Sequence, residues 1–197
     1  MIHPIEAESY RLLVGLVDLS HLSPGTRAVV ERVIHATADL AYADSVVAPE
    51  AVVQAAVRAV AEGGPVVTDV EMTRVAITGV AARCYLSEAS PLSDVEAAEG
   101  GTRSAAAVRL IAERHPEGAV VVIGCAPTAL DELLRLASRG RIVPAAVIAM
   151  PVGFVGAAAA KAAALASGLP VIANTGDKGG AAVAAAACNA IVRLAHG

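Results

Sequence analysis

The chain has 197 residues, of which 56% are hydrophobic and 17% are charged, and its formal net charge at pH 7 is −4. This length and apolar fraction predict a single folded domain with a sizeable core and argue against a disordered chain. Nucleic-acid binding rests on clustered lysine and arginine, so the negative net charge and the lack of a basic run argue against a nucleic-acid ligand.

Targeting and redox features favour a cytoplasmic protein. The first residues lack the basic and apolar regions of a signal peptide. Residues 142–160 carry no charge, but Pro144 and Pro151 interrupt them, so we expect a strand, a turn and a helix there and no membrane span. The cysteines, at positions 84, 125 and 188, have no metal-type spacing and fit reduced, buried thiols.

Apolar periodicity predicts helices through the first third of the chain. Residues 4–17, 24–38 and 49–62 show helical spacing, with Ser23 and Pro24 as N-cap and first-turn proline of the second helix. Residues 42–47 are ambiguous, and an extended conformation is one possibility for them.

After residue 64 the pattern changes to apolar runs that alternate with helices. The predicted strands are residues 65–69, 83–86, 119–123, 143–148 and 170–173. The predicted helices are residues 70–75 (closed by Gly79), 93–98, 103–114, 127–138, 156–167 and 180–194. This alternation predicts an α/β fold with a mostly parallel, doubly wound sheet of about five strands and helices on both faces. A helical section (1–64) and a βα core (65–197) would form one domain.

One histidine stands in a pattern that suits proton transfer. His35 lies near the end of the predicted helix 24–38, Arg32 precedes it by three residues and Asp39 follows it by four. On a continuous helix all three side chains share a face. The same spacing is also typical of a partly buried structural histidine, so spacing alone leaves both interpretations open.

Loops at the strand ends predict an anion-binding edge. In open parallel sheets ligands bind beyond the carboxyl ends of the strands. The segments rich in glycine, proline and small polar residues that would meet there are 68–72, 100–104, 124–128, 150–154 and 174–180. Helix N-termini at such an edge offer free N–H groups to carboxylates or phosphates, and Arg103, Lys161 and Lys178 would add positive charge. Each loop alone is better explained by ordinary turn chemistry, and the presence of five such loops at one edge is what favours a ligand site.

Several classes of site are disfavoured by their missing motifs. The glycines form neither a phosphate-binding P-loop nor a dinucleotide fingerprint, no nucleophile elbow occurs, and the five histidines are scattered, so we expect no metal site. The residues alone therefore predict a cytoplasmic α/β protein that binds an anionic small molecule and has one candidate acid–base histidine.

Seven segments in order resemble the precorrin-8X methylmutase family. They are IEAESYR (5–11), RVIHATAD (32–39), TDVEM (68–72), TRSAAA (102–107), APTAL (126–130), PVGFVGA (151–157) and KGGAAVAAAACNA (178–190). Together they span nearly the whole chain, and TRSAAA, APTAL and PVGFVGA are specific in combination.

The resemblance implies an isomerase of cobalamin biosynthesis. The methyl group at C11 of precorrin-8X, or of cobalt-precorrin-8, would move to C12 to give hydrogenobyrinic or cobyrinic acid. It further implies His35 as proton donor, a polycarboxylated corrinoid substrate, no cofactor and a homodimer. The substrate-binding residues expected are Ser9, Arg32, Thr68, Met72, Thr102, Arg103, Ser104, Thr128, Val152, Gly153, Phe154, Lys161, Lys178 and Gly179.

The chain departs from the family pattern at several positions near the expected pocket. Cys125 replaces an amide, Asp131 an aromatic residue, and Ala159, Ala160 and Ala181 replace a glutamate and two serines. These changes motivate one alternative, a corrinoid-binding relative that holds its ligand without turnover. A nucleotide-binding domain that uses residues 176–180 is a further, weaker alternative.

Overall fold

The computed structural model describes residues 3–89 and 101–197, and within them the strands form one six-stranded sheet in the order β1-β6-β5-β4-β2-β3. The strands are β1 (Val46–Val47), β2 (Val66–Thr68), β3 (Arg83–Cys84), β4 (Val120–Ile123), β5 (Ala146–Ala149) and β6 (Val171–Asn174). All neighbouring pairs are parallel except β1 with β6, which are antiparallel. The predicted mostly parallel α/β sheet is confirmed, with β1 as an added edge strand.

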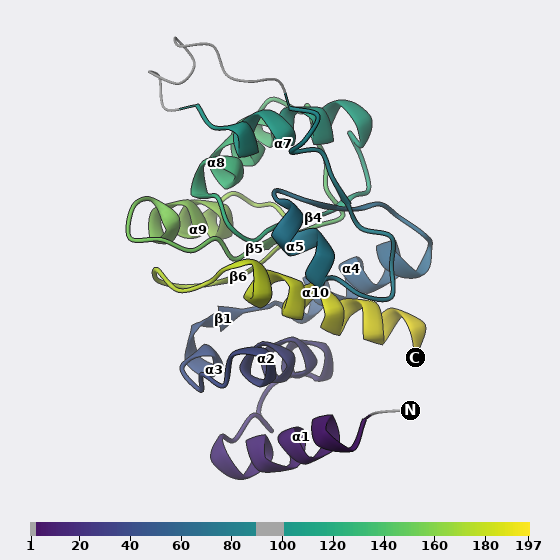
Figure 1. The fold of residues 1–197 in the computed structure, drawn as a ribbon, viewed down its shortest axis with the longest axis vertical. Coiled ribbons are helices and arrows are strands. Elements are labelled where there is room, and N and C mark those ends of the chain that lie inside the picture. The colour runs from purple at the N-terminus through teal and green to yellow at the C-terminus, as the bar shows by residue number, and fades with distance from the viewer. Residues whose placement is uncertain (1–2, 90–100) are drawn as a thin grey trace.

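Helices cover both faces of this sheet (Figure 1). They are α1 (Pro4–Leu16), α2 (Pro24–Thr37), α3 (Tyr42–Ser45), α4 (Glu50–Ala61), α5 (Glu71–Ala76), α7 (Arg103–Arg114), α8 (Pro127–Ser138), α9 (Ala157–Ala166) and α10 (Ala181–His196). One face carries α7, α8 and α9, and the other carries α4, α5 and α10, with α2 and then α1 stacked outside α10 (Figure 1).

The central strands alternate their side chains between two hydrophobic cores. Val120 and Val122 point into the core beneath α10, and Val121 and Ile123 point into the core beneath α7 and α8. All four are fully buried, which explains why β4 is a continuous run of β-branched residues without polar alternation.

Most predicted elements fall within a few residues of the observed ones, and Ser23 is the N-cap residue of α2 as predicted. Residues 42–47 are a short helix followed by β1, rather than one extended segment. Ser23 stands at the N-cap of α2, but its side chain makes no cap hydrogen bond; Glu50 accepts from the Thr26 amide at 2.9 Å instead. The predicted helix 93–98 lies outside the described residues.

Candidate active site

His35 lies in the last turn of α2, where α1 covers that helix (Figure 1). Its Nδ1 is 2.7 Å from the Ser9 hydroxyl oxygen of α1. The Tyr10 ring stacks on the imidazole, with ring centroids 5.0 Å apart and planes inclined by 15°. Because Nδ1 is engaged, Nε2 is the ring nitrogen available to a ligand.

The surroundings of His35 favour the neutral imidazole. Burial lowers the pKa of His35, and the positive charges of Arg32 and Arg193 lower it further, while Glu6 acts in the opposite direction. A histidine with a lowered pKa is mostly uncharged at pH 7, where it can still donate one N–H hydrogen bond.

The predicted shared face of Arg32, His35 and Asp39 is wrong for Asp39. The helix ends at Thr37, and Ala38 takes a left-handed conformation with φ of 53°, which turns the chain away. Asp39 forms an ion pair with Lys178, and Arg32 pairs with Glu6 at 2.7 Å. Both charged side chains are therefore engaged elsewhere than on the imidazole.

A groove of about 470 Å³ runs between α1 and the end of α2 beside His35. Its apolar lining consists of Ile5, Leu12, Leu13, Leu16, Ile34, Ala38 and Leu40, and its polar members are Glu8, Ser9 and His35. Concave, mostly apolar surfaces with a few converging polar groups are typical of small-molecule sites.

The N-termini of α7 and α8 lie side by side at the carboxyl edge of the sheet. Thr102 caps α7 by accepting from the Ala105 amide at 3.1 Å, as predicted, and its hydroxyl also lies 2.7 Å from the Thr128 hydroxyl. Ser104 is half-buried in the first turn of α7. The Arg103 guanidinium donates to the Leu86 carbonyl at 3.1 Å. Two adjacent positive helix ends form an environment that favours an anion.

The loop after β5 exposes large apolar side chains. Phe154 is 97% exposed and Val152 is 44% exposed, while the Gly153 amide donates to the Asp177 carbonyl at 3.1 Å and joins this loop to the next one. Met72, at the start of α5, is also exposed.

The loop after β6 is tied to the end of α2. Lys178 pairs with Asp39, and Gly179 has φ of 151°, where a Cβ would stand 2.4 Å from the Met150 carbonyl oxygen, so only glycine fits. The His35 helix and the carboxyl edge of the sheet are thereby joined.

Two predicted substrate-binding side chains are buried and used internally. Lys161 is fully buried; its ammonium donates to the Lys178 carbonyl and, at 3.4 Å, to the Asn174 side-chain oxygen. Burial lowers the pKa of Lys161 to about 8. Thr68 is also fully buried and donates to the Val70 carbonyl. In this structure both shape the loops and neither presents a free group to a ligand.

Sequence reasoning missed the role of Asp69 at this edge. Its fully buried carboxylate accepts from the amides of Gly124, Cys125 and Ala126 at 2.9–3.0 Å. Asp69 follows β2 and these amides follow β4, which is the point where the sheet order reverses. An acidic residue directly after an apolar strand was the available signal.

The described residues contain no group of three or more histidine, cysteine or acidic side chains that could hold a metal ion. Within residues 3–89 and 101–197, every helix is too short or too polar to cross a lipid bilayer. Among the departures, Cys125 is half-buried and Asp131 is exposed on α8, and desolvation raises the pKa of both side chains.

These features define the class as an α/β protein whose strand-end loops and one partly buried histidine face the same end of the molecule. The model of the precorrin-8X methylmutase family matches residues 4–194. The chain belongs to this family, whose members are isomerases of cobalamin biosynthesis.

Relatives and a solved structure agree with this assignment. The chain is 40% identical to the cobalt-precorrin-8 methylmutase of Methanothermobacter thermautotrophicus, over 90% of this chain and 84% of the relative. It is 37% identical to the precorrin-8X methylmutase of Pseudomonas aeruginosa, over 95% and 93% respectively. The crystal structure of the precorrin-8X methylmutase from Thermus thermophilus superimposes with a TM-score of 0.85 at 34% identity, covering 97% of this chain and 95% of that one.

Proposed function

We propose that this chain moves the methyl group from C11 to C12 of precorrin-8X or cobalt-precorrin-8, with His35 as the proton donor. The observation that carries this role is the position of His35 in the groove, with Nδ1 held by Ser9 and Nε2 available. When the Ser9 hydroxyl donates to Nδ1, the proton of the neutral ring resides on Nε2 and faces the substrate.

The rest of the site supports positioning of the substrate. A methyl shift within one molecule needs the macrocycle held in one geometry, so most of the catalysis comes from orientation plus one proton transfer. We propose that the apolar groove takes the ring, with contacts from Lys178 and the loop of Val152, Gly153 and Phe154. The helix N-termini at Thr102, Arg103, Ser104 and Thr128 lie on the other face of the sheet, so we propose that those of the second copy in a homodimer bind the substrate carboxylates. No step requires a cofactor.

We further propose a homodimer in the cytoplasm. Ile5 and Leu16 on α1 are 75% and 67% exposed, and Phe154 and Val155 are 97% and 89% exposed. Large apolar side chains exposed to this extent are candidates for an interaction surface, and a second copy is the proposed partner. All three cysteines are unpaired thiols, which suits a reducing compartment.

Mixing the protein with precorrin-8X, and separately with cobalt-precorrin-8, tests the function through the change in corrinoid absorbance. Catalytic conversion supports the isomerase and shows which form is used. A stable complex without conversion would instead identify the corrinoid-binding alternative, which the departures at Cys125 and Asp131 motivate. Sedimentation at the mass of one chain would contradict the dimer.

A further inference from the structure

Helix α1 supplies two of the neighbours of His35 although it has little apolar contact of its own. Leu13 is the one residue among its 13 that is buried, while Ile5, Leu12 and Leu16 remain exposed. Short helices in proteins are stabilised mainly by packing of an apolar face. Something besides apolar burial must therefore hold α1 against the body of the protein.

Glu6 joins α1 to two other helices through a single carboxylate oxygen. Arg32 of α2 donates to its Oε1 at 2.7 Å, and Arg193 of α10 donates to the same oxygen at 2.6 Å. The side chains of Glu6 and Arg32 are only 19% and 23% exposed. A charge-assisted contact that is partly shielded from water contributes more than a surface ion pair does.

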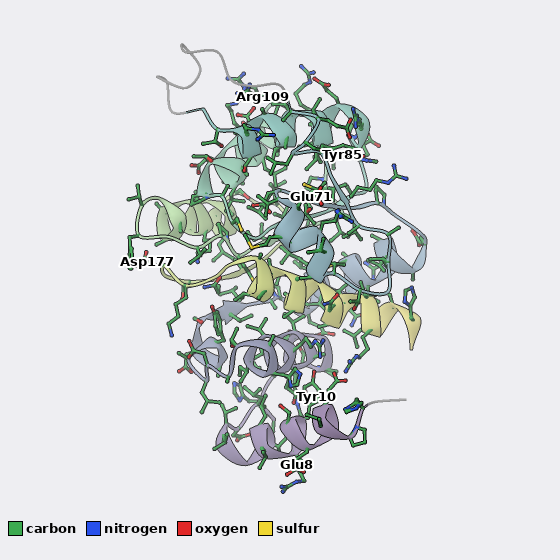
Figure 2. All side chains as sticks on the ribbon, viewed as in Figure 1. Glu8, Tyr10, Glu71, Tyr85, Arg109 and Asp177 are labelled. Carbon is green, nitrogen blue, oxygen red and sulfur yellow. The ribbon has the colours of Figure 1, made fainter. Side chains whose placement is uncertain are left out.

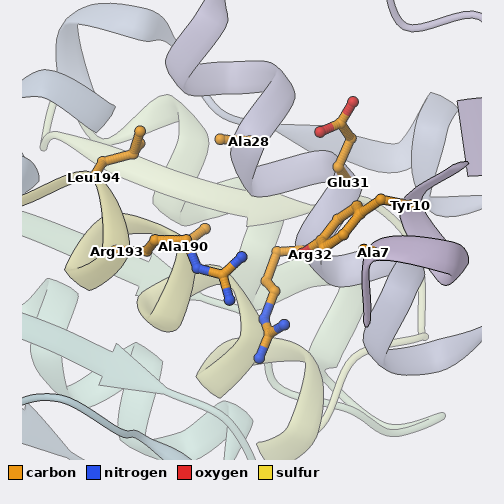
Figure 3. Close-up of a pocket in the computed structure, with 8 residues that line it drawn as sticks. All are labelled: Ala7, Tyr10, Ala28, Glu31, Arg32, Ala190, Arg193 and Leu194. Carbon is orange, nitrogen blue, oxygen red and sulfur yellow. The ribbon is translucent and has the colours of Figure 1, made fainter. Parts of the chain in front are cut away.

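The two guanidinium groups approach from different elements, as Figure 3 shows for Arg32 on α2 and Arg193 on α10, beside Tyr10. A hollow of about 330 Å³ lies among these three side chains. The arginines belong to helices that pack closely on one another, so they form a fixed receptor for the carboxylate of α1.

The Glu6–Arg32 contact and the contacts of His35 with α1 lie in register along the two helices. On α1, Ser9 and Tyr10 follow Glu6 by three and four residues, so they share its face; on α2, His35 follows Arg32 by three. The Glu6–Arg32 contact and the contacts of Ser9 and Tyr10 with His35 are therefore successive steps along one helix–helix interface.

We infer that Glu6, held between Arg32 and Arg193, is a positioning residue for His35. By docking α1 it places the Ser9 hydroxyl on Nδ1 and the Tyr10 ring against the imidazole, which leaves Nε2 directed at the groove. Arg193 shares this role, and Arg32, expected from the family resemblance to bind substrate, belongs to the docking contact.

The charged and titratable groups around His35 determine in which direction its pKa changes when the Glu6 contact is lost. They are Glu6 and Tyr10 on α1, Arg32 on α2 and Arg193 on α10. Loss of the Glu6 charge with α1 still docked would lower the pKa of His35, because both arginines would be uncompensated. Undocking of α1 would raise the pKa toward its ordinary value, because the imidazole would regain water.

The test is Glu6→Gln in the ligand-free full chain, followed by NMR titration of His35 and amide hydrogen exchange. We expect the α1 amides to exchange roughly tenfold faster or more, the factor set by loss of one charge-assisted hydrogen bond, and the pKa of His35 to rise. Arg193→Met should also accelerate α1 exchange, to a smaller extent because Arg32 remains. The amide of Val121 in β4 should keep its protection and report an intact fold.

Glu31→Gln is the matched control. Glu31 is a second carboxylate near this interface. It lies on α2, and its partner is Arg27 on the same helix, at 2.6 Å. This change should leave α1 exchange and the His35 titration as in the parent. Unchanged α1 exchange in Glu6→Gln, or a lower pKa of His35, would overturn the positioning role.

The catalytic meaning of this inference rests on the proposed function, but both measurements use the protein without substrate. A chain that docks α1 through Glu6 yet fails to convert substrate would refute the proposed function alone. A chain that turns over normally with Glu6→Gln and keeps α1 protected would refute the positioning role alone.

Discussion

Two histidines of this chain have closely similar neighbours at opposite sides of the sheet. His35 contacts the Ser9 hydroxyl, stacks on Tyr10 and lies near Arg32. His115 contacts the Tyr85 hydroxyl at 2.6 Å, and its ring lies 5.8 Å from the Tyr85 ring, over which Arg114 is placed. Figure 2 shows Tyr10 between α1 and α2 and Tyr85 beside α7, on the far side of the sheet.

The difference lies in what the rest of each imidazole faces. The groove beside His35 is mostly apolar and close to the carboxyl edge, to which Asp39 and Lys178 connect it. The hollow beside His115 is lined by Arg74, Arg83 and Arg114, with Glu88 paired to Arg114 at 2.6 Å. His115 precedes β4 and so stands toward the amino edge of the sheet, where α/β proteins rarely bind substrate. Location decides which histidine is a catalytic candidate.

Replacing each histidine gives the largest expected contrast. His35→Ala should lower turnover of precorrin-8X by roughly two to four powers of ten, the usual contribution of a general acid, while product binding persists. His115→Ala should leave turnover near the parent value. Rates are followed by corrinoid absorbance. Turnover of His35→Ala close to that of the parent would remove the catalytic assignment.

Removing an arginine near each region tests where the ligand carboxylates bind. Arg103→Ala should raise the Kd for hydrogenobyrinic acid by about tenfold or more, because a hydrogen bond to a charged group contributes about 1.5–3 kcal/mol. Arg83→Ala, in the hollow beside His115, is the matched control and should bind as the parent does. Calorimetric titration gives both constants; equal constants for parent and Arg103→Ala would take this arginine out of the site.

The hydroxyl partners of the two histidines should separate catalysis from stability. Ser9→Ala should lower kcat by up to about tenfold with KM little changed, since one neutral hydrogen bond contributes about 0.5–1.5 kcal/mol to orienting the ring. Tyr85→Phe should leave kcat intact and lower the free energy of unfolding by about 1 kcal/mol, measured in urea. A kcat for Ser9→Ala equal to that of the parent would show that the ring needs no such partner.

The smallest expected effect is the dependence of the free energy of unfolding on pH. Burial lowers the folded-state pKa of both histidines below the ordinary 6.5. The unfolded chain then binds more protons between the lowered pKa and 6.5, so the free energy of unfolding is highest above 6.5 and falls as pH decreases through this window. Urea unfolding from pH 7.5 to 5.5 measures the slope. His35→Ala and His115→Ala should each flatten it, and an unaltered slope in both would contradict the assignment.

Local sequence patterns predicted the secondary structure well wherever apolar burial was the deciding force. The β-branched run of β4 and the alanine-rich α10 follow directly from periodicity. The end of α2 was predicted to within one residue, but the position of Asp39 was not, because a left-handed residue at Ala38 separates Asp39 from the helix and alanine carries no signal for that conformation. β1 has only two residues and exists because β6 pairs with it.

For the candidate site, chemistry was readable from sequence but geometry was not. Motifs and a capping pattern identified His35, Thr102 and Thr128 as candidates. The burial of Lys161 was not predicted, because a lysine next to an alanine run is expected to be exposed. In the structure its ammonium donates hydrogen bonds to the Asn174 side-chain oxygen and the Lys178 carbonyl. Asp69 escaped notice because its three amide partners lie 55 to 57 residues away.

The sequence by itself determined the α/β class, the order of the elements and the family, because these depend on periodicity and on ordered local motifs. Only the tertiary structure decided the surroundings of His35. Its partner Ser9 and the Glu6 contact to Arg193 join residues separated by 26 and 187 positions. Such contacts form only when α1, α2 and α10 pack together, and no local pattern encodes that packing.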